Sequence, residues 1–302
     1  MACSQLRIAL AAMLASGLLA ACSAPGQRSD GRLSVVVAES PWGAVASVIG
    51  GSHVAVTSVL RDASIDPHEY APSAPVAAEV ATADVVIENG LGYDSFMDQL
   101  LGTGAAHARR TVVAASVLGV HGDAANPHLW YWIARVPEVA AAIERTFAAA
   151  DPFHAASYEV NLARFDASMS GLDTELAQIR ASHHGTAVAQ TERVAGYLLA
   201  QAGLEVVSPD GFALAIEEGH EPSAADTRSM TALLAHGGVT ALVVNTQTSS
   251  RLTDDLQAEA RAGGIPVVAV TELVDPVGST YVAWQQRQID ALRRALGPTG
   301  SA

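Results

Sequence analysis

The sequence contains no lysine and only two cysteines, and aromatic residues make up just 5% of its 302 positions. All its basic residues are therefore arginines, and they form no basic stripe of the kind that binds nucleic acid. With 31 acidic residues against 17 basic ones, the formal net charge is −14. The scarcity of cysteine excludes thiolate metal sites and a disulfide framework. Hydrophobic residues make up 50% of the chain, which is enough for two modest domains with their own cores.

Residues 1–21 have the character of a secretory leader. Arg7 is their only charged residue, and the apolar run over 8–21 is too short to span a bilayer comfortably. The run ends at Leu19-Ala20-Ala21-Cys22, and small residues before a cysteine are what a lipoprotein signal peptidase requires. We expect a lipoprotein signal peptide over 1–21, a lipid on Cys22 and a flexible tether over 22–32, which would anchor an extracytoplasmic protein to the membrane. The alternative is an ordinary cleaved leader with a chance cysteine.

Short runs of β-branched and apolar residues alternate with stretches of helical spacing in both halves of the chain. Strands are expected at 33–38, 53–60, 84–87, 111–113, 186–189, 204–207, 241–244 and 266–270. Helices are expected from Pro41 to Gly50 and at 76–82, 193–201, 223–235, 252–262 and 281–296. This alternation implies parallel βαβ units. We therefore predict an α/β protein with two lobes, residues 33–150 and 185–298, each built on a mostly parallel sheet.

One long helix is expected between the lobes, in the linker over residues 151–184. From Pro152 to Ser182 there is no further proline, and apolar residues recur at steps of three or four. Asp151 and Pro152 are suited to begin it as N-cap and first helical residue. Thirty helical residues would span about 45 Å. Such a helix would be a stiff connector between the lobes.

Two loops carry the same pattern, an Asx-Pro-His triplet with an aromatic residue two positions after the histidine. One is Asp66-Pro67-His68-Glu69-Tyr70, and the other is Asn126-Pro127-His128-Leu129-Trp130. Proline restricts the residue before it and its own φ, so each histidine is held on a stiff loop. Both loops follow strand carboxyl ends, where open α/β sheets bind ligands. Because imidazole is a common transition-metal ligand, the matched pair indicates a metal site, with incidental surface histidines as the alternative.

Acidic residues of the second half supply candidate oxygen ligands. Thr191-Glu192 lies between a strand and a helix, where Thr191 can cap and the helix dipole favours Glu192. Asp275 follows the final strand in an Asp-Pro-x-Gly turn, and Glu272 lies three residues earlier. On their own, these acids are explained as cap and turn residues. Asn245, which ends another strand, is a candidate hydrogen-bond partner for such a site.

With these segments the mature chain resembles the zinc/manganese ABC-transporter solute-binding lipoproteins, which bind metal in a cleft between two lobes joined by one long helix. The resemblance rests on the two Asx-Pro-His loops, on Glu192 followed by Gly196-Tyr197-Leu198, and on Asp275-Pro276-Val277-Gly278 followed by Tyr281. It implies His68, His128, Glu192 and Asp275 as the four metal ligands.

The sequence departs from this family at two places. Zinc importers of the family often carry a long loop rich in histidine and acids between the two histidine segments, whereas here only His121, Gly122 and Asp123 precede Asn126. The segment 273–279 is also shorter than in many relatives, so Glu272 is an alternative to Asp275. Asp275 is favoured, since the site needs a carboxylate facing His68 across the cleft.

The implied cargo is one divalent metal ion, with Zn²⁺ and Mn²⁺ equally compatible with two imidazoles and two carboxylates. The implied partners are an ABC permease and its ATPase, with the receptor itself a monomer. Because each lobe supplies two ligands, the metal would bridge the lobes, and its release would involve the loops near His68 or Asp275.

Other functions are weaker alternatives. A metal-dependent hydrolase would need an open coordination position, and the sequence contains neither a His-Glu-x-x-His nor a Gly-x-Ser-x-Gly motif. A siderophore or vitamin receptor would need an aromatic or arginine-lined pocket, for which aromatic residues are too few. A surface adhesion role is compatible with metal binding and stays open.

Overall fold

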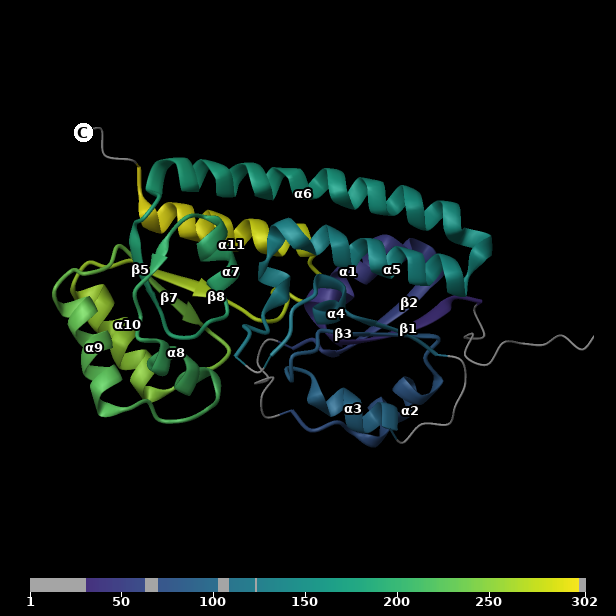
Figure 1. Ribbon diagram of the computed structural model, residues 1–302, viewed down its shortest axis with the longest axis horizontal. Coiled ribbons are helices and arrows are strands. Elements are labelled where there is room, and N and C mark those ends of the chain that lie inside the picture. The colour runs from purple at the N-terminus through teal and green to yellow at the C-terminus, as the bar shows by residue number, and fades with distance from the viewer. Residues whose placement is uncertain (1–30, 63–69, 103–108, 123, 299–302) are drawn as a thin grey trace, which may run out of the picture.

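The computed structural model describes residues 31–62, 70–102, 109–122 and 124–298. The expected leader, Cys22 and His68 lie outside these residues. The described part confirms the predicted α/β class, because two four-stranded sheets of parallel strands are flanked by helices and joined by one long helix (Figure 1).

The first lobe is built on the sheet order β2-β1-β3-β4. Its strands are β1 (Leu33–Glu39), β2 (Val54–Leu60), β3 (Val85–Glu88) and β4 (Arg110–Val113). Its helices are α1 (Ser40–Gly50), α2 (Ala74–Thr82), α3 (Ser95–Gly102), α4 (Ala114–Leu118) and α5 (Val136–Ala150). The central strand β1 is buried along its whole length, as its run of β-branched residues predicts. All four strands are parallel, so their carboxyl ends form one edge.

The second lobe repeats this arrangement with the order β6-β5-β7-β8. Its strands are β5 (Ala187–Gln190), β6 (Glu205–Val206), β7 (Leu242–Asn245) and β8 (Val267–Val270), again all parallel. Its helices are α7 (Gly196–Gln201), α8 (Asp210–Glu217), α9 (Ala224–Ala235), α10 (Arg251–Ala262) and α11 (Tyr281–Leu296). The carboxyl ends of β5 and β8 are followed by the acids singled out in the sequence, and β7, which lies between them in the sheet, ends at Asn245.

Helix α6 (Ala155–His183) connects the lobes and is 29 residues long, about 43 Å at 1.5 Å per residue. A 3₁₀ turn over Pro152–His154 precedes it. Figure 1 shows α6 running along both lobes, with α5 and α11 beneath it. It packs against α1, α5 and α11 through a buried row of residues from Tyr158 to Ile179. The connector is therefore part of the core of both lobes.

The hydrophobic core is shared between the lobes. One cluster extends from β1, β3 and α1 through α6 to α11 and the buried face of α7. A second, smaller cluster lies within the second lobe, around Phe212, Met230 and Leu256. A core that crosses the boundary resists independent motion of the lobes, because separating them would expose apolar surface.

Hydrogen bonds also fix how the lobes meet. The hydroxyl of Tyr131 lies 2.5 Å from Oε1 of Gln288 and 2.7 Å from the carbonyl oxygen of Thr271. In the other direction, the hydroxyl of Tyr281 donates to the carbonyl oxygen of Trp130 at 2.6 Å. Helix α11 therefore ties the second lobe to the segment that follows His128.

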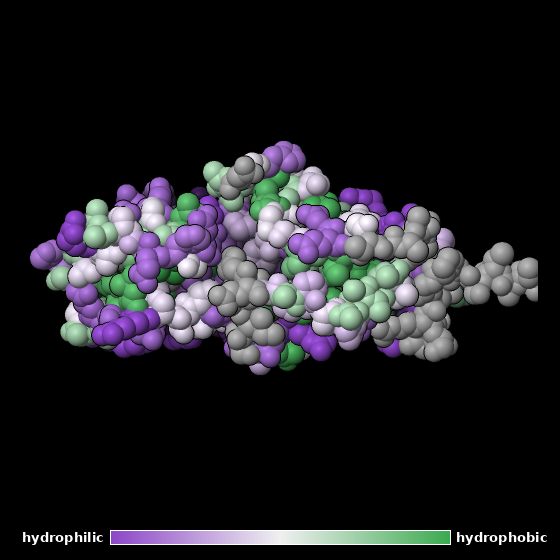
Figure 2. Space-filling view, turned by 90° about the horizontal axis from the view of Figure 1, so that it is seen from below, coloured by the Kyte–Doolittle hydropathy of each residue, from purple (hydrophilic) through white to green (hydrophobic). Residues whose placement is uncertain are grey.

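None of the described helices has the length and apolar character that a bilayer-crossing helix requires. On the face seen in Figure 2, hydrophilic residues are interspersed with hydrophobic ones over both lobes.

Candidate metal centre

His128 is completely buried and its ring is oriented by its own motif. Oδ1 of Asn126 accepts a hydrogen bond from the backbone N–H of His128 at 3.0 Å and lies 2.7 Å from its Nδ1. Because Oδ1 cannot donate, Nδ1 carries the hydrogen, and the lone pair of the neutral ring is on Nε2. The amide of Asn126 is itself fixed, since its Nδ2 donates to the carbonyl oxygen of Arg193 at 2.7 Å. The Asx-Pro-His motif thus presents Nε2 as a free ligand atom.

Glu272 lies directly in front of that lone pair. It comes two residues after β8 and is completely buried, and its Oε2 is 3.4 Å from Nε2 of His128. Nε2 has no hydrogen-bond partner in the described structure. A buried lone pair facing a carboxylate is unfavourable unless a cation lies between them. This pair therefore marks a position for a proton or a metal ion.

Glu192 lies two residues after β5, which β7 separates from β8 in the sheet, and it is 3% exposed. The sequence interpretation that Thr191 caps a helix and that Glu192 lies in its first turn was wrong. Helix α7 begins at Gly196, and its N-cap, Ala195, makes no side-chain cap. The helix dipole therefore does not account for Glu192, which is held instead by Asn245 at the end of β7 and by Thr248 in the loop after β7.

Asn245 joins the two glutamates. Its Nδ2 donates to Oε1 of Glu272 at 2.6 Å and to Oε2 of Glu192 at 2.9 Å. The remaining oxygen of Glu192 accepts from the hydroxyl of Thr248, and Oε2 of Glu272 accepts from the hydroxyl of Tyr93 at 2.6 Å. The expectation that Asn245 hydrogen-bonds the acids is confirmed.

Burial and proximity shift the ionisation of these groups. Burial raises the pKa of Glu192 to about 7; the charge of Glu272 adds to this rise, and the hydrogen bonds from Asn245 and Thr248 oppose it. Burial lowers the pKa of His128, but the adjacent Glu272 outweighs this effect, and the net shift is upward. The site therefore prefers a positive charge near His128 and Glu272.

The four residues proposed from the sequence are not all brought together. His128 and Glu192 share the site, His68 lies outside the described residues, and Asp275 is exposed on the surface. The carbonyl oxygen of Asp275 accepts from Nη2 of Arg287 at 2.5 Å. Within the described ranges, no three His, Cys, Asp or Glu side chains are already close enough to hold an ion together.

The sequence interpretation missed Tyr93 and Thr248. Tyr93 follows β3, so it too lies at a strand carboxyl end, and its ring packs edge-on against His128 and Trp130 at centroid distances of 5.7 and 4.9 Å. Position after a strand was the only available signal for it. Trp130, the aromatic residue that ends the second motif, is completely buried with its ring 5.6 Å from that of His128.

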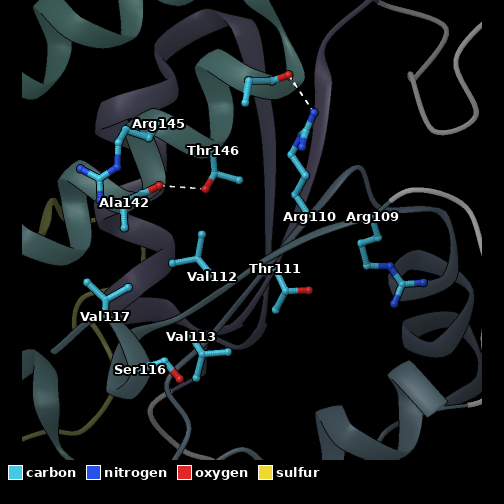
Figure 3. A pocket seen from close by; sticks show the side chains of 11 residues that line it. Arg109, Arg110, Thr111, Val112, Val113, Ser116, Val117, Ala142, Arg145 and Thr146 are labelled. Carbon is cyan, nitrogen blue, oxygen red and sulfur yellow. Dashed lines mark hydrogen bonds between the residues drawn. The ribbon is translucent and has the colours of Figure 1, made fainter. Parts of the chain in front are cut away.

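A separate hollow of about 720 Å³ lies between β4 and α5 in the first lobe (Figure 3). Arg109, Arg110 and Arg145 line it together with small and apolar residues, and the residues that line it include no histidine or acid. It has no suitable groups for a cation, so the buried His128–Glu272 pair remains the candidate metal centre.

Two parallel α/β lobes joined by a packed long helix, with polar residues converging at the strand ends between them, define a two-lobe solute-binding protein. The chain belongs to the family described as zinc-uptake complex component A, periplasmic, whose model matches residues 35–295. Members of this family are uptake components rather than enzymes, so the hydrolase alternative is set aside.

Curated relatives and solved structures agree with this assignment. The chain is 23% identical to the zinc-binding lipoprotein AdcA of Streptococcus pneumoniae over 97% of its own length, but it spans only 61% of that relative. It is 25% identical to the manganese-binding lipoprotein MntA of Bacillus subtilis, covering 90% of this chain and 92% of MntA. The solute-binding protein FpvC of Pseudomonas aeruginosa, solved with Ni²⁺, has the same fold with a TM-score of 0.74 and 23% identity over 90% of this chain and 99% of FpvC.

Proposed function

We propose that this protein is the receptor of an ABC importer that captures one divalent transition metal ion and delivers it to a permease and its ATPase. The observation that carries this proposal is the buried Nε2 of His128, which has no hydrogen-bond partner among the described residues and faces Oε2 of Glu272 at 3.4 Å. A cation between these atoms would turn their repulsion into two favourable contacts. The family and the zinc- and manganese-binding relatives support a metal as that cation.

The proposed ligands are His68, His128, Glu192 and Glu272. Two neutral imidazoles and two carboxylates sum with M²⁺ to zero formal charge, which lowers the cost of burying the ion. Glu272 takes the place that the resemblance gave to Asp275, because Glu272 is buried beside His128 whereas Asp275 is exposed. His68 is included among the proposed ligands on the basis of its Asx-Pro-His motif alone.

The same proposal includes attachment to the membrane through a lipid on Cys22, as the lipoprotein relatives suggest. With residues 22–32 as tether, the receptor would stay close to its permease without a spanning helix. It would act as a monomer, since each copy carries both halves of the site.

Metal content measured directly tests the proposal. The mature protein, purified without chelator, is expected to contain about one equivalent of transition metal by elemental analysis. His128→Ala and Glu272→Ala are expected to lower the affinity measured by calorimetry about a hundredfold or more, a larger loss than changes around metal ligands usually cause.

Asp275→Ala is the matched control, because it removes an acid three residues away that is exposed. Its affinity should stay within about threefold of the unsubstituted protein, since an exposed carboxylate contributes little. Equal losses of metal affinity in Asp275→Ala and Glu272→Ala would contradict the ligand assignment. Absence of metal binding by the unsubstituted protein would contradict the function.

A further inference from the structure

We propose that the open edge of β4 accepts an extended acidic peptide segment of a partner protein as an additional strand, with Arg110 and Arg145 binding its carboxylates. Three observations carry this proposal: the position of β4 in its sheet, the hollow between β4 and α5, and the arginines that flank this hollow. The inference goes beyond the receptor function and does not depend on the metal centre, because the described residues that line the hollow include none of the proposed metal ligands.

Strand β4 is the last strand of the first sheet, and among the described residues only β3 pairs with it. The backbone N–H of Arg110 donates to the carbonyl oxygen of Asp84 at 3.1 Å, so the backbone groups of Arg110 face β3. Because successive residues of a strand direct their backbone groups to opposite sides, those of Thr111 face the open side. Thr111 is also exposed, so its N–H and C=O are available to pair with an added strand.

The space beside this edge can hold a strand. The hollow of about 720 Å³ between β4 and α5 is lined by every residue of β4 (Figure 3). The side chains of Val112, Val117 and Ala142 give it apolar walls. An added strand would lie about 4.8 Å from β4, and the side chains on one of its faces would enter the hollow. Helix α4 begins at Ala114, so the available edge is limited to Arg110–Val113.

Charge selects the kind of segment. Arg110 and Arg145 are exposed and flank the hollow, whereas Figure 3 shows Arg109 turned away from them. Nη2 of Arg110 donates to the carbonyl oxygen of Ala149 at 3.0 Å, which stabilises the end of α5 and holds the guanidinium beside the edge. Neither Arg110 nor Arg145 has an ion-pair partner among the described residues. Because a guanidinium binds carboxylates through several N–H donors, an acidic segment fits these residues.

The same charges disfavour the other occupants of an open edge. A second copy of this chain, paired edge to edge, would bring its own arginines against these, and each copy has a formal net charge of −14. Charged side chains on short edge strands commonly protect against such self-pairing. A membrane surface would meet the arginines but has no peptide groups to pair with Thr111. An extended acidic segment satisfies both the backbone and the charges.

The test titrates the mature protein into a fluorescently labelled peptide of alternating valine and glutamate and follows its anisotropy. Thr111→Pro removes the outward N–H but leaves the bonds to β3, since proline is tolerated where the N–H faces away from the sheet. This variant should bind the peptide about tenfold more weakly. Thr111→Val, which keeps the N–H, is the matched control and should bind as the unsubstituted protein does.

The charge contribution is measured with the same peptide. Arg110→Gln and Arg145→Gln should each weaken its binding about threefold, as expected for exposed ion pairs. Arg228→Gln is the control, because Arg228 is an exposed arginine on α9 of the second lobe, and it should change nothing. A peptide with lysine in place of glutamate should show no binding.

A third arm leaves the protein unaltered and therefore holds even if Thr111→Pro fails to fold. The valine–glutamate peptide methylated on its backbone nitrogens keeps its charge but cannot donate hydrogen bonds to a strand edge. It should bind at least about tenfold more weakly than the unmethylated peptide. Equal binding of the two peptides overturns the inference, as does a failure of the unmethylated peptide to bind the unsubstituted protein.

Two further outcomes would assign the surface to another occupant and also overturn the inference. One is binding to phosphatidylglycerol vesicles that Arg110→Gln weakens, without binding of the peptide. The other is a dimer in sedimentation velocity that Thr111→Pro dissociates. Metal binding by the unsubstituted protein is measured separately, so failure of this inference leaves the receptor function standing.

Discussion

Nε2 of His128 and Oε2 of Glu272 lie 3.4 Å apart, with both side chains completely buried. His128 belongs to the first lobe and Glu272 follows the last strand of the second, so the pair joins the two halves of the molecule at one point. The burial removes water as an alternative partner. If the proposed function holds, occupancy of this point by a proton or by a metal affects both metal affinity and stability.

The competition between proton and metal predicts a pH dependence of binding. The pKa of Glu192 is raised to about 7 by burial, with the charge of Glu272 adding to the shift, and the pKa of His128 is also raised. Both groups must lose a proton to bind metal, so affinity should fall as pH drops below about 7. Calorimetry in two buffers of different ionisation enthalpy should detect more than one proton released per metal at pH 6. An affinity that is constant from pH 8 to pH 6 would contradict this.

Removal of Asn245 should destabilise the metal-free protein. In Asn245→Ala, Oε1 of Glu272 and Oε2 of Glu192 lose their donor while they remain buried. The free energy of unfolding, measured with urea in the presence of chelator, should fall by about 3 kcal/mol at pH 8. The loss should shrink at pH 5, where protonation of Glu192 reduces the repulsion.

Asn161→Ala is the comparison for that change, because its amide donates to the carbonyl oxygen of Ile49 at 3.0 Å and no carboxylate is involved. The free energy of unfolding of Asn161→Ala should be lower by about 1 kcal/mol, and this decrease should not depend on pH. A pH-dependent loss of equal size in both variants would argue against the bridging role of Asn245.

Glu39, which is not one of the proposed ligands, supplies a second pH-dependent prediction. It ends β1, is completely buried, and neither carboxylate oxygen has a hydrogen-bond partner in the described structure. Burial, followed by the charges of Asp94 and Glu88, raises its pKa well above the ordinary value. An acid whose pKa is raised on folding costs stability as pH rises above its unfolded pKa.

Glu39→Gln should therefore stabilise the metal-free protein at pH 8 by about 1 to 3 kcal/mol and have little effect at pH 5, as followed by urea unfolding. The substitution keeps the shape and removes the charge. An increase in the free energy of unfolding that is larger at pH 5 than at pH 8 would show that ionisation of Glu39 is not the cause of the stabilisation.

Tyr131 tests how strongly the lobes depend on each other. Its hydroxyl reaches Gln288 and Thr271 of the second lobe, and Phe at this position keeps the ring but removes the link. We expect Tyr131→Phe to lower the free energy of unfolding by about 1 to 2 kcal/mol, with thermal unfolding still a single transition because one core crosses both lobes. Two separate transitions in calorimetry would contradict this shared core.

Much of the fold could be predicted from the sequence because its strands are short, buried and parallel. The run at 33–38 became β1, and the expected last helix at 281–296 has the observed bounds of α11. Helix α5 was missed, since Pro137 interrupts its pattern, yet proline is tolerated in a first helical turn. Helix α8 was missed because it is only eight residues long, and a segment this short shows too little hydrophobic periodicity to be distinguished from a loop.

The candidate site was only partly predictable. The Asx-Pro-His motif indicated a rigid His128, because proline and the asparagine side chain act locally. Local sequence could not decide between Glu272 and Asp275, since both follow β8 within five residues. The difference comes from Tyr93 and Asn245, which lie far away in sequence and donate to Glu272 in the folded chain.

The position of helix α11 at the end of the chain determines when, during synthesis, the two lobes can be fixed against each other. Two of the residues that fix the second lobe against Trp130 and Tyr131, namely Tyr281 and Gln288, belong to this last helix. During synthesis, the metal centre can acquire its final geometry only after nearly the whole chain has emerged. A product interrupted before residue 281 would retain every proposed ligand but would lack the hydrogen bonds that Tyr281 and Gln288 make to Trp130 and Tyr131.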